Sequence, residues 1–381
     1  MRNLENNYPK AFDDIIIQQL YEGDESKYIL GSPTNDRYIT GNKRNCEIFY
    51  LLLNDLDGKK SVESIALKWN RSIKETETII DMFFKKGLLI GSSNDNDISE
   101  VRKLSIRLLS IKCSHLEKIN KRCAGIILNT SFLILIAMLI FNMYHLCNNE
   151  LSGVSLFTYD GSYIKGLILS SLIMVPSFLF HELYHSFIAL KYGLKPSKID
   201  MCLYLLFFPL FYVKIKGMYT TSSRNRIRIL CGGYFANFIL ANMSLMLFFM
   251  TKHNIFLTIV LAQLNIIIVN CNPFNLTDGY FIGTQLLKTI NLRPKLFKLL
   301  ANFRSNILKV DKTLIIYAIV NCVIIFINII YFSNYSLRLF SEVLNVRVST
   351  GIIIGYNIVT LLLYYLIIVF RYKEKKDGNQ G

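Results

Sequence analysis

Six long apolar runs constrain this chain more than any other feature, because each approaches the roughly 20 residues that a helix needs to cross a bilayer. They lie at residues 124–146, 165–190, 228–250, 254–271, 313–333 and 350–370. Over the whole chain 52% of residues are hydrophobic and 18% are charged, which is too apolar for an ordinary soluble domain. We therefore expect an α-helical multi-pass membrane protein with about six transmembrane helices.

A seventh apolar stretch, MCLYLLFFPLFYV at residues 201–213, is too short to span a bilayer. It also contains Pro209, which cannot donate a backbone hydrogen bond. Irregular backbone at membrane depth is tolerated where protein or water surrounds it. We expect one re-entrant hairpin here.

The net charge of +16 raises the possibility of nucleic-acid binding, so the placement of the basic residues decides what the charge means. Lys and Arg gather before the first apolar run, between the second and third, between the fourth and fifth, and after the last. The alternate connections contain only Lys165, Lys252, Arg338 and Arg347. Basic residues are enriched in cytoplasmic loops. We expect a cell-membrane protein with both termini in the cytoplasm and no nucleic-acid partner.

The first 91 residues are polar and mixed, and they predict a cytosolic α+β domain. Residues 14–40 resemble short strands, helical periodicity follows at 43–54, 61–69 and 73–86, and LLIG at 88–91 resembles a final strand. Ser72 and Glu75 predict a capping box at the start of the third helix. Three helices with small strands indicate a winged-helix-like fold. We expect a linker and basic juxtamembrane segment at 92–122, a membrane domain at 123–371 and a cytosolic tail at 372–381.

Ionisable residues interrupt the second apolar run, where they cost free energy unless they bind something. His181, Glu182 and His185 form the pattern H-E-x-x-H. On an α-helix the two imidazoles lie on one face, about 40° apart and one turn along the axis. They can share a zinc ion, and Glu182 can accept a proton from water beside it. The alternative is a chance pattern, or two helical histidines that only form hydrogen bonds. Neither explains why these ionisable side chains lie among phenylalanines.

A zinc ion held by two histidines needs a third protein ligand. The eight cysteines are scattered with no C-x-x-C pair, so they indicate neither a thiolate zinc site nor a disulfide framework. The fourth apolar run ends in NCNPFNLTDGY, where Pro273 should break the helix before Asp278. By position alone Asp278 is equally well a metal ligand or a helix N-cap.

These motifs together resemble those of the site-2 protease family of intramembrane zinc metalloproteases. The resemblance rests on H-E-x-x-H at 181–185, on N-P-x-x-x-x-D-G at 272–279, and on a weaker likeness at 226–241 in which Tyr234 replaces the usual proline. It implies that His181, His185 and Asp278 bind Zn²⁺ and that Glu182 is catalytic. It also makes Asn237 and Asn272 candidates for positioning substrate, although a helix–helix hydrogen bond explains Asn237 equally well.

The amino-terminal domain has a different resemblance, to the PqqD-like domains that bind leader segments of precursor peptides. It rests on LLNDLDGKKSVESIALKW and the residues that follow it to Gly91. A winged helix more often binds DNA, but a DNA reader should carry a basic recognition helix. Residues 72–86 instead balance three lysines against three acidic residues. The connections of the membrane domain are too short to hold the PDZ domain that many signalling members of the protease family carry.

We therefore expect an intramembrane zinc endopeptidase that cleaves a precursor peptide or a small membrane-associated substrate, in peptide maturation or export. Its partners would be that peptide, the lipid bilayer, and a peptide-modifying enzyme or an exporter. One alternative is regulated proteolysis that releases a membrane-anchored regulator. Another is a non-catalytic membrane protein that binds a peptide for immunity or export.

Overall fold

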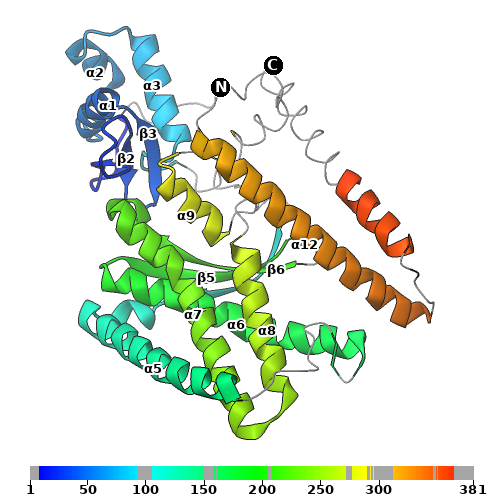
Figure 1. Cartoon of the computed structure of the whole chain (residues 1–381). Helices are drawn as coiled ribbons and strands as arrows, with labels where there is room; N and C mark the ends of the chain where they lie inside the picture. The colour runs from blue at the N-terminus through cyan, green and yellow to red at the C-terminus, as the bar shows by residue number, and fades with distance from the viewer. Residues whose placement is uncertain are drawn as a thin grey trace. The chain divides into compact units, whose positions relative to one another are not determined.

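The computed structural model divides the chain into two compact units. One comprises Met1–Leu128 with His185–Ile229, and the other comprises Asn129–Tyr184 with Leu230–Gly381. Each unit is described by itself below (Figure 1). The structure describes residues 8–92, 105–148, 158–159, 161–204, 208–271, 277–289, 292, 295, 312–345, 349 and 351–363.

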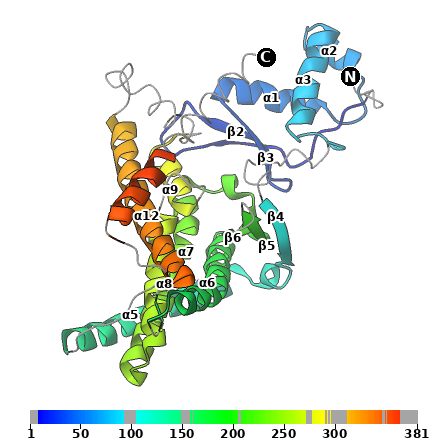
Figure 2. The same ribbon diagram turned by 90° about the vertical axis from the view of Figure 1, so that its right-hand side faces the viewer.

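The amino-terminal part of the first unit is a small α+β domain, hereafter the amino-terminal module. Its strands form an antiparallel sheet in the order β1-β2-β3, and three helices follow (Figure 2). The elements are β1 (Ile16–Gln19), β2 (Tyr28–Ser32), β3 (Arg37–Gly41), α1 (Lys43–Asp55), α2 (Val62–Lys68) and α3 (Ile73–Lys85). Leu30, Leu53, Ile65 and Phe83 are almost inaccessible and form a shared core. The module therefore has a hydrophobic core of its own.

Local sequence signals place the helices of the module. Asn42, Ser61 and Ser72 each accept a hydrogen bond from the backbone N–H three residues later, as N-cap residues do. The predicted capping box of Ser72 and Glu75 is present, and the three predicted helices are confirmed. The predicted strand at 88–91 is wrong, because Leu89 makes only an isolated bridge to Ala11. The stretch pairs with residues 10–12 through only two backbone hydrogen bonds, from Phe12 N–H to the Leu88 carbonyl at 3.4 Å and from Ile90 N–H to the Lys10 carbonyl at 2.8 Å.

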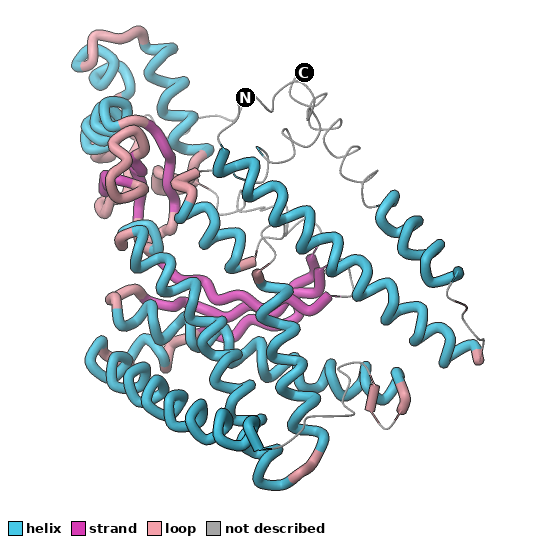
Figure 3. Tube along the Cα trace, in the orientation of Figure 1, coloured by secondary structure: helices cyan, strands magenta, loops and turns pink. Residues whose placement is uncertain are grey.

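A second antiparallel sheet lies in the first unit, with the strand order β4-β5-β6 (Figure 3). Its strands are β4 (Ser105–Lys112), β5 (Lys195–Tyr204) and β6 (Phe208–Lys216). Strands β5 and β6 form a hairpin over the stretch where the sequence predicted one. Strand β4 falls in the predicted linker and was not expected. The buried Asp200 of β5 holds β4 in the sheet. Its carboxylate accepts hydrogen bonds from Ser110 of β4 at 2.5 Å and from Lys198 at 2.8 Å.

Long helices make up the rest of the described chain. They are α5 (Lys121–Asn148), α6 (Tyr163–Lys191), α7 (Ser223–Thr251), α8 (Asn254–Asn270), α9 (Asp278–Leu286) and α12 (Lys312–Leu344), and Gly351–Leu363 is also helical. Three of these, α5, α6 and α7, are long and apolar enough to cross a membrane. Helix α8 and the helix Gly351–Leu363 are apolar but shorter. Within the described residues there are thus three candidate spans, whereas the sequence predicted about six over the whole chain.

Buried amides connect the apolar helices of the second unit. The side chain of Asn142 in α5 donates to the carbonyl of Asn242 in α7 at 2.9 Å and to its amide oxygen at 3.2 Å. Gln263 in α8 donates to the hydroxyl of Ser177 in α6 at 2.6 Å. In an apolar environment such bonds fix which helix faces meet. The second of them holds α6 one turn before His181.

Candidate metal centre

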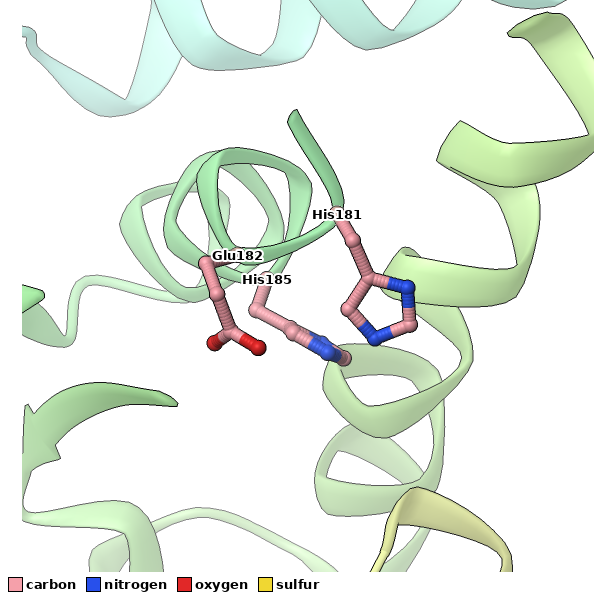
Figure 4. A group of neighbouring side chains, drawn as sticks. All are labelled: His181, Glu182 and His185. Atoms are coloured by element: carbon pink, nitrogen blue, oxygen red, sulfur yellow. The ribbon is translucent and has the colours of Figure 1, made fainter. Parts of the chain in front are cut away.

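Helix α6 presents His181, Glu182 and His185 within its buried part. Their exposed fractions are 3%, 8% and 5%, and Figure 4 shows the three side chains on one side of the helix. One ligand atom from each lies within 4.8 Å of the other two, so the group could hold a metal ion. The helix continues through Pro176, which lies inside it five residues before His181. The i, i+4 spacing thus produces the arrangement that it predicted.

Asp278 lies against this group from a part of the chain 97 residues away. Its carboxylate oxygen Oδ2 is 2.8 Å from Nε2 of His181. The N-cap position of α9 belongs to Thr277, whose hydroxyl donates to the carbonyl of Asn270. Asp278 is therefore the first residue of α9 and not its N-cap, and its side chain points to the histidine.

The side chains gathered here carry donor atoms of the kinds that bind metal ions. Nδ1 of His185 lies 2.7 Å from the carbonyl oxygen of Ile229 in α7, so this nitrogen carries the proton and donates to that oxygen. Its Nε2 is then the unprotonated nitrogen, which is how a metal-binding histidine is usually oriented. Two imidazole nitrogens and one carboxylate oxygen are the protein ligands of many catalytic zinc ions.

Helix α7 approaches α6 closely at His181. A Cβ atom added at Gly233 would lie 2.1 Å from Nε2 of His181, so a larger residue there would displace the imidazole. The next residue, Tyr234, donates from its hydroxyl to the carbonyl of Asn270 at 2.8 Å, and its ring centre is 6.5 Å from that of His181. The adjacent glycines in an apolar run were a sequence signal for close helix packing. The contact of the Ile229 carbonyl had no sequence signal, because any residue supplies that group.

The two remaining predicted site residues have different outcomes. Asn237 lies in α7 and is fully buried, and within the described part of the chain neither its amide nitrogen nor its amide oxygen has a hydrogen-bond partner. A buried amide without partners costs about 1–3 kcal/mol, so a structural role for it as a helix–helix hydrogen bond has no support. Asn272 lies outside the described residues.

Comparison with known proteins gives no relative for this chain: no protein-family model matches it, and neither a curated protein nor a solved structure does. The buried group of His181, Glu182 and His185, and the position of Asp278 beside it, therefore carry the functional argument.

Proposed function

We propose that the chain is an intramembrane zinc endopeptidase that cleaves a precursor peptide or a small membrane-associated substrate. The observation that carries this proposal is the H-E-x-x-H group, buried in an apolar helix, with the carboxylate of Asp278 at 2.8 Å from His181. Placing two imidazoles and two carboxylates among apolar helices is costly unless a cation and a reaction use them.

The residues would divide the chemistry as follows. His181, His185 and Asp278 hold the zinc ion, which when bound supplies a Lewis acid that polarises the scissile carbonyl and acidifies water. Glu182 accepts the proton of the attacking water and then donates it to the leaving amine. Asn237 supplies a buried amide that orients the substrate near the reacting carbonyl. The Ile229 carbonyl keeps His185 in the tautomer that the metal requires.

The membrane setting follows from the same helices. We propose six spans, adding α8, α12 and the helix that begins at Gly351 to the three candidate spans α5, α6 and α7. With both termini in the cytoplasm, the basic connections fall on the cytoplasmic side of a cell membrane. Burial of the site among the apolar helices would exclude bulk water, so that the water at the metal is the one that reacts.

The amino-terminal module supports a peptide substrate. Its three helices and three-stranded sheet agree with the predicted α+β domain, and the faces of α3 carry balanced charge. A module that captures a leader segment raises the effective concentration of the attached peptide at the active site. This favours peptide maturation or export over the release of a membrane-anchored regulator.

The test is Glu182→Gln, assayed for zinc content and for cleavage of a casein labelled with a self-quenching fluorophore. We expect the variant to keep its zinc and to lose cleavage by at least about a hundredfold, since general-base catalysis contributes roughly 10²–10⁴-fold. The matched control, Glu77→Gln on the exposed face of α3, should behave as wild type. Full activity in Glu182→Gln would remove the assigned role. Metal-free wild-type protein would favour the non-catalytic peptide-binding alternative.

A further inference from the structure

Arg226, in the first turn of α7, is one of the largest fully buried side chains in the described part of the protein, with 1% of its surface exposed. Its guanidinium donates to the carbonyl of Thr221 at 3.3 Å and to the carbonyl of Leu20 in the amino-terminal module. A buried guanidinium needs such acceptors, because an uncompensated buried charge costs several kcal/mol. The contact with Leu20 therefore connects two segments 206 residues apart.

Three more contacts surround this bond within the same unit. The guanidinium lies over the ring of Tyr219, 5.5 Å from its centre. That ring meets Tyr38 of β3 edge-on, with ring centres 5.3 Å apart. On the surface Arg224 pairs with Glu22 at 3.2 Å. The amino-terminal module thus contacts residues 219–226, the end of the connection between β6 and α7 and the first turn of α7, through a buried cation, an aromatic pair and an exposed ion pair.

The same helical turn reaches the candidate metal centre. Ile229 follows Arg226 by three residues, so the two lie on one face of α7. Ile229 is itself buried, and its carbonyl accepts the hydrogen bond of His185. A shift of this first turn would move the carbonyl and release the imidazole from its orientation. Only the helical segment from Arg226 to Ile229 therefore separates the contacts of the guanidinium from the hydrogen bond to His185.

We propose that Arg226 is a positioning residue through which docking of the amino-terminal module holds His185 in its metal-binding orientation. The inference rests on the proposed function for the importance of that orientation. It extends that function by making the module part of the metal centre's support as well as a site of peptide capture. Displacement of the module would then loosen the metal centre.

The experiment measures the rate at which zinc is lost to a chelator from the full chain in detergent. We expect Arg226→Ala to lose zinc about tenfold faster than wild type, since removing support from a metal-bound histidine typically weakens the site 10–100-fold. Arg226→Lys should fall between the two, because lysine can donate to Leu20 but cannot stack on Tyr219 as a planar group. The matched control is Arg228→Ala. Arg228 lies in the same helical turn, is exposed, and donates a hydrogen bond to the hydroxyl of Tyr192.

A second variant keeps the test valid if Arg226→Ala fails to fold. Tyr38→Ala removes the aromatic contact from the module side and leaves α7 unchanged, and we expect it also to accelerate zinc loss. Hydrogen exchange at residues 16–22 reports release of the module in either variant. Release of the module with zinc loss at the wild-type rate would overturn the coupling. A wild-type chain that takes up no zinc would instead overturn the proposed function, and the coupling with it.

Discussion

At the scale of single residues, the site combines groups that a sequence motif can specify with groups that it cannot. The spacing of His181 and His185 was sufficient to predict their shared helix face. The role of Asp278 was ambiguous in the sequence, and only the fold separates it from the N-cap position of Thr277. The carbonyl of Ile229 could not be predicted at all, since backbone atoms carry no sequence signal. A glycine at position 233 is explained by the imidazole of His181, which occupies the space that a Cβ atom would need.

Asn237 offers a prediction at this scale. Because its buried amide has no hydrogen-bond partner among the described residues, Asn237→Leu should leave the thermal midpoint unchanged or raise it. If the amide orients substrate, casein cleavage should fall about a hundredfold, as it does when a donor to the reacting carbonyl is lost.

The matched control is Asn242→Leu, which removes an amide bonded to Asn142 and to the carbonyl of Phe238. That variant should lower the thermal midpoint. A destabilised Asn237→Leu with full cleavage would show that Asn237 serves helix packing instead.

At the scale of elements, prediction succeeded where the signal was local. The helices α1, α2 and α3 begin at capping residues that the sequence displays, and the hairpin of β5 and β6 covers the apolar stretch in which a hairpin was expected, with Pro209 inside β6. Strand β4 was missed because its partner β5 is some 90 residues away, and a basic segment before an apolar run resembles a juxtamembrane linker. The stretch LLIG has strand composition, but its pairing with residues 10–12 is a single isolated bridge, which is too short for a strand.

The end of α1 gives a prediction about the stability of the module. Burial raises the pKa of Asp55, but hydrogen bonds from Lys68, Trp69 and Lys60 outweigh this effect and hold the pKa below its usual value. A lowered folded-state pKa stabilises the fold above the unfolded pKa of about 3.9, and this contribution disappears as the pH falls through the folded value. The module should therefore loosen in acid.

Trp69 is the single tryptophan of the chain, so its fluorescence reports on this interaction in the intact protein. Asp55→Asn should lower the free energy of unfolding of the module by about 1–2 kcal/mol at pH 7 and remove the acid dependence. The control Asp81→Asn breaks only the exposed pair with Lys85 at 2.5 Å, which contributes about 0.3–0.5 kcal/mol. Equal effects of the two substitutions would contradict the assigned role of Asp55.

At the scale of the whole molecule, the apolar runs predicted a membrane protein, and among the described residues three helices meet the length and composition that a span requires. The contact between His181 and Asp278 joins distant segments. The position of Asp278 in the sequence left a metal ligand and an N-cap equally open, and the resemblance to a protease family favoured the ligand. Hydropathy locates helices in a membrane, but it does not determine which of them carry ligands to one site. Side chains that are distant in the sequence, such as His181 and Asp278, are brought together only by the tertiary fold.

The most direct measurement is the metal content of the detergent-purified chain by mass spectrometry, comparing wild type with His181→Ala, Asp278→Ala and the control His253→Ala. His253 is an exposed N-cap residue of α8, outside the candidate metal centre. The proposed site predicts about one zinc per chain in wild type and control, and loss of zinc in both site variants. Zinc retained in Asp278→Ala would remove Asp278 from the ligand set. No zinc in wild type after repletion would contradict the central claim.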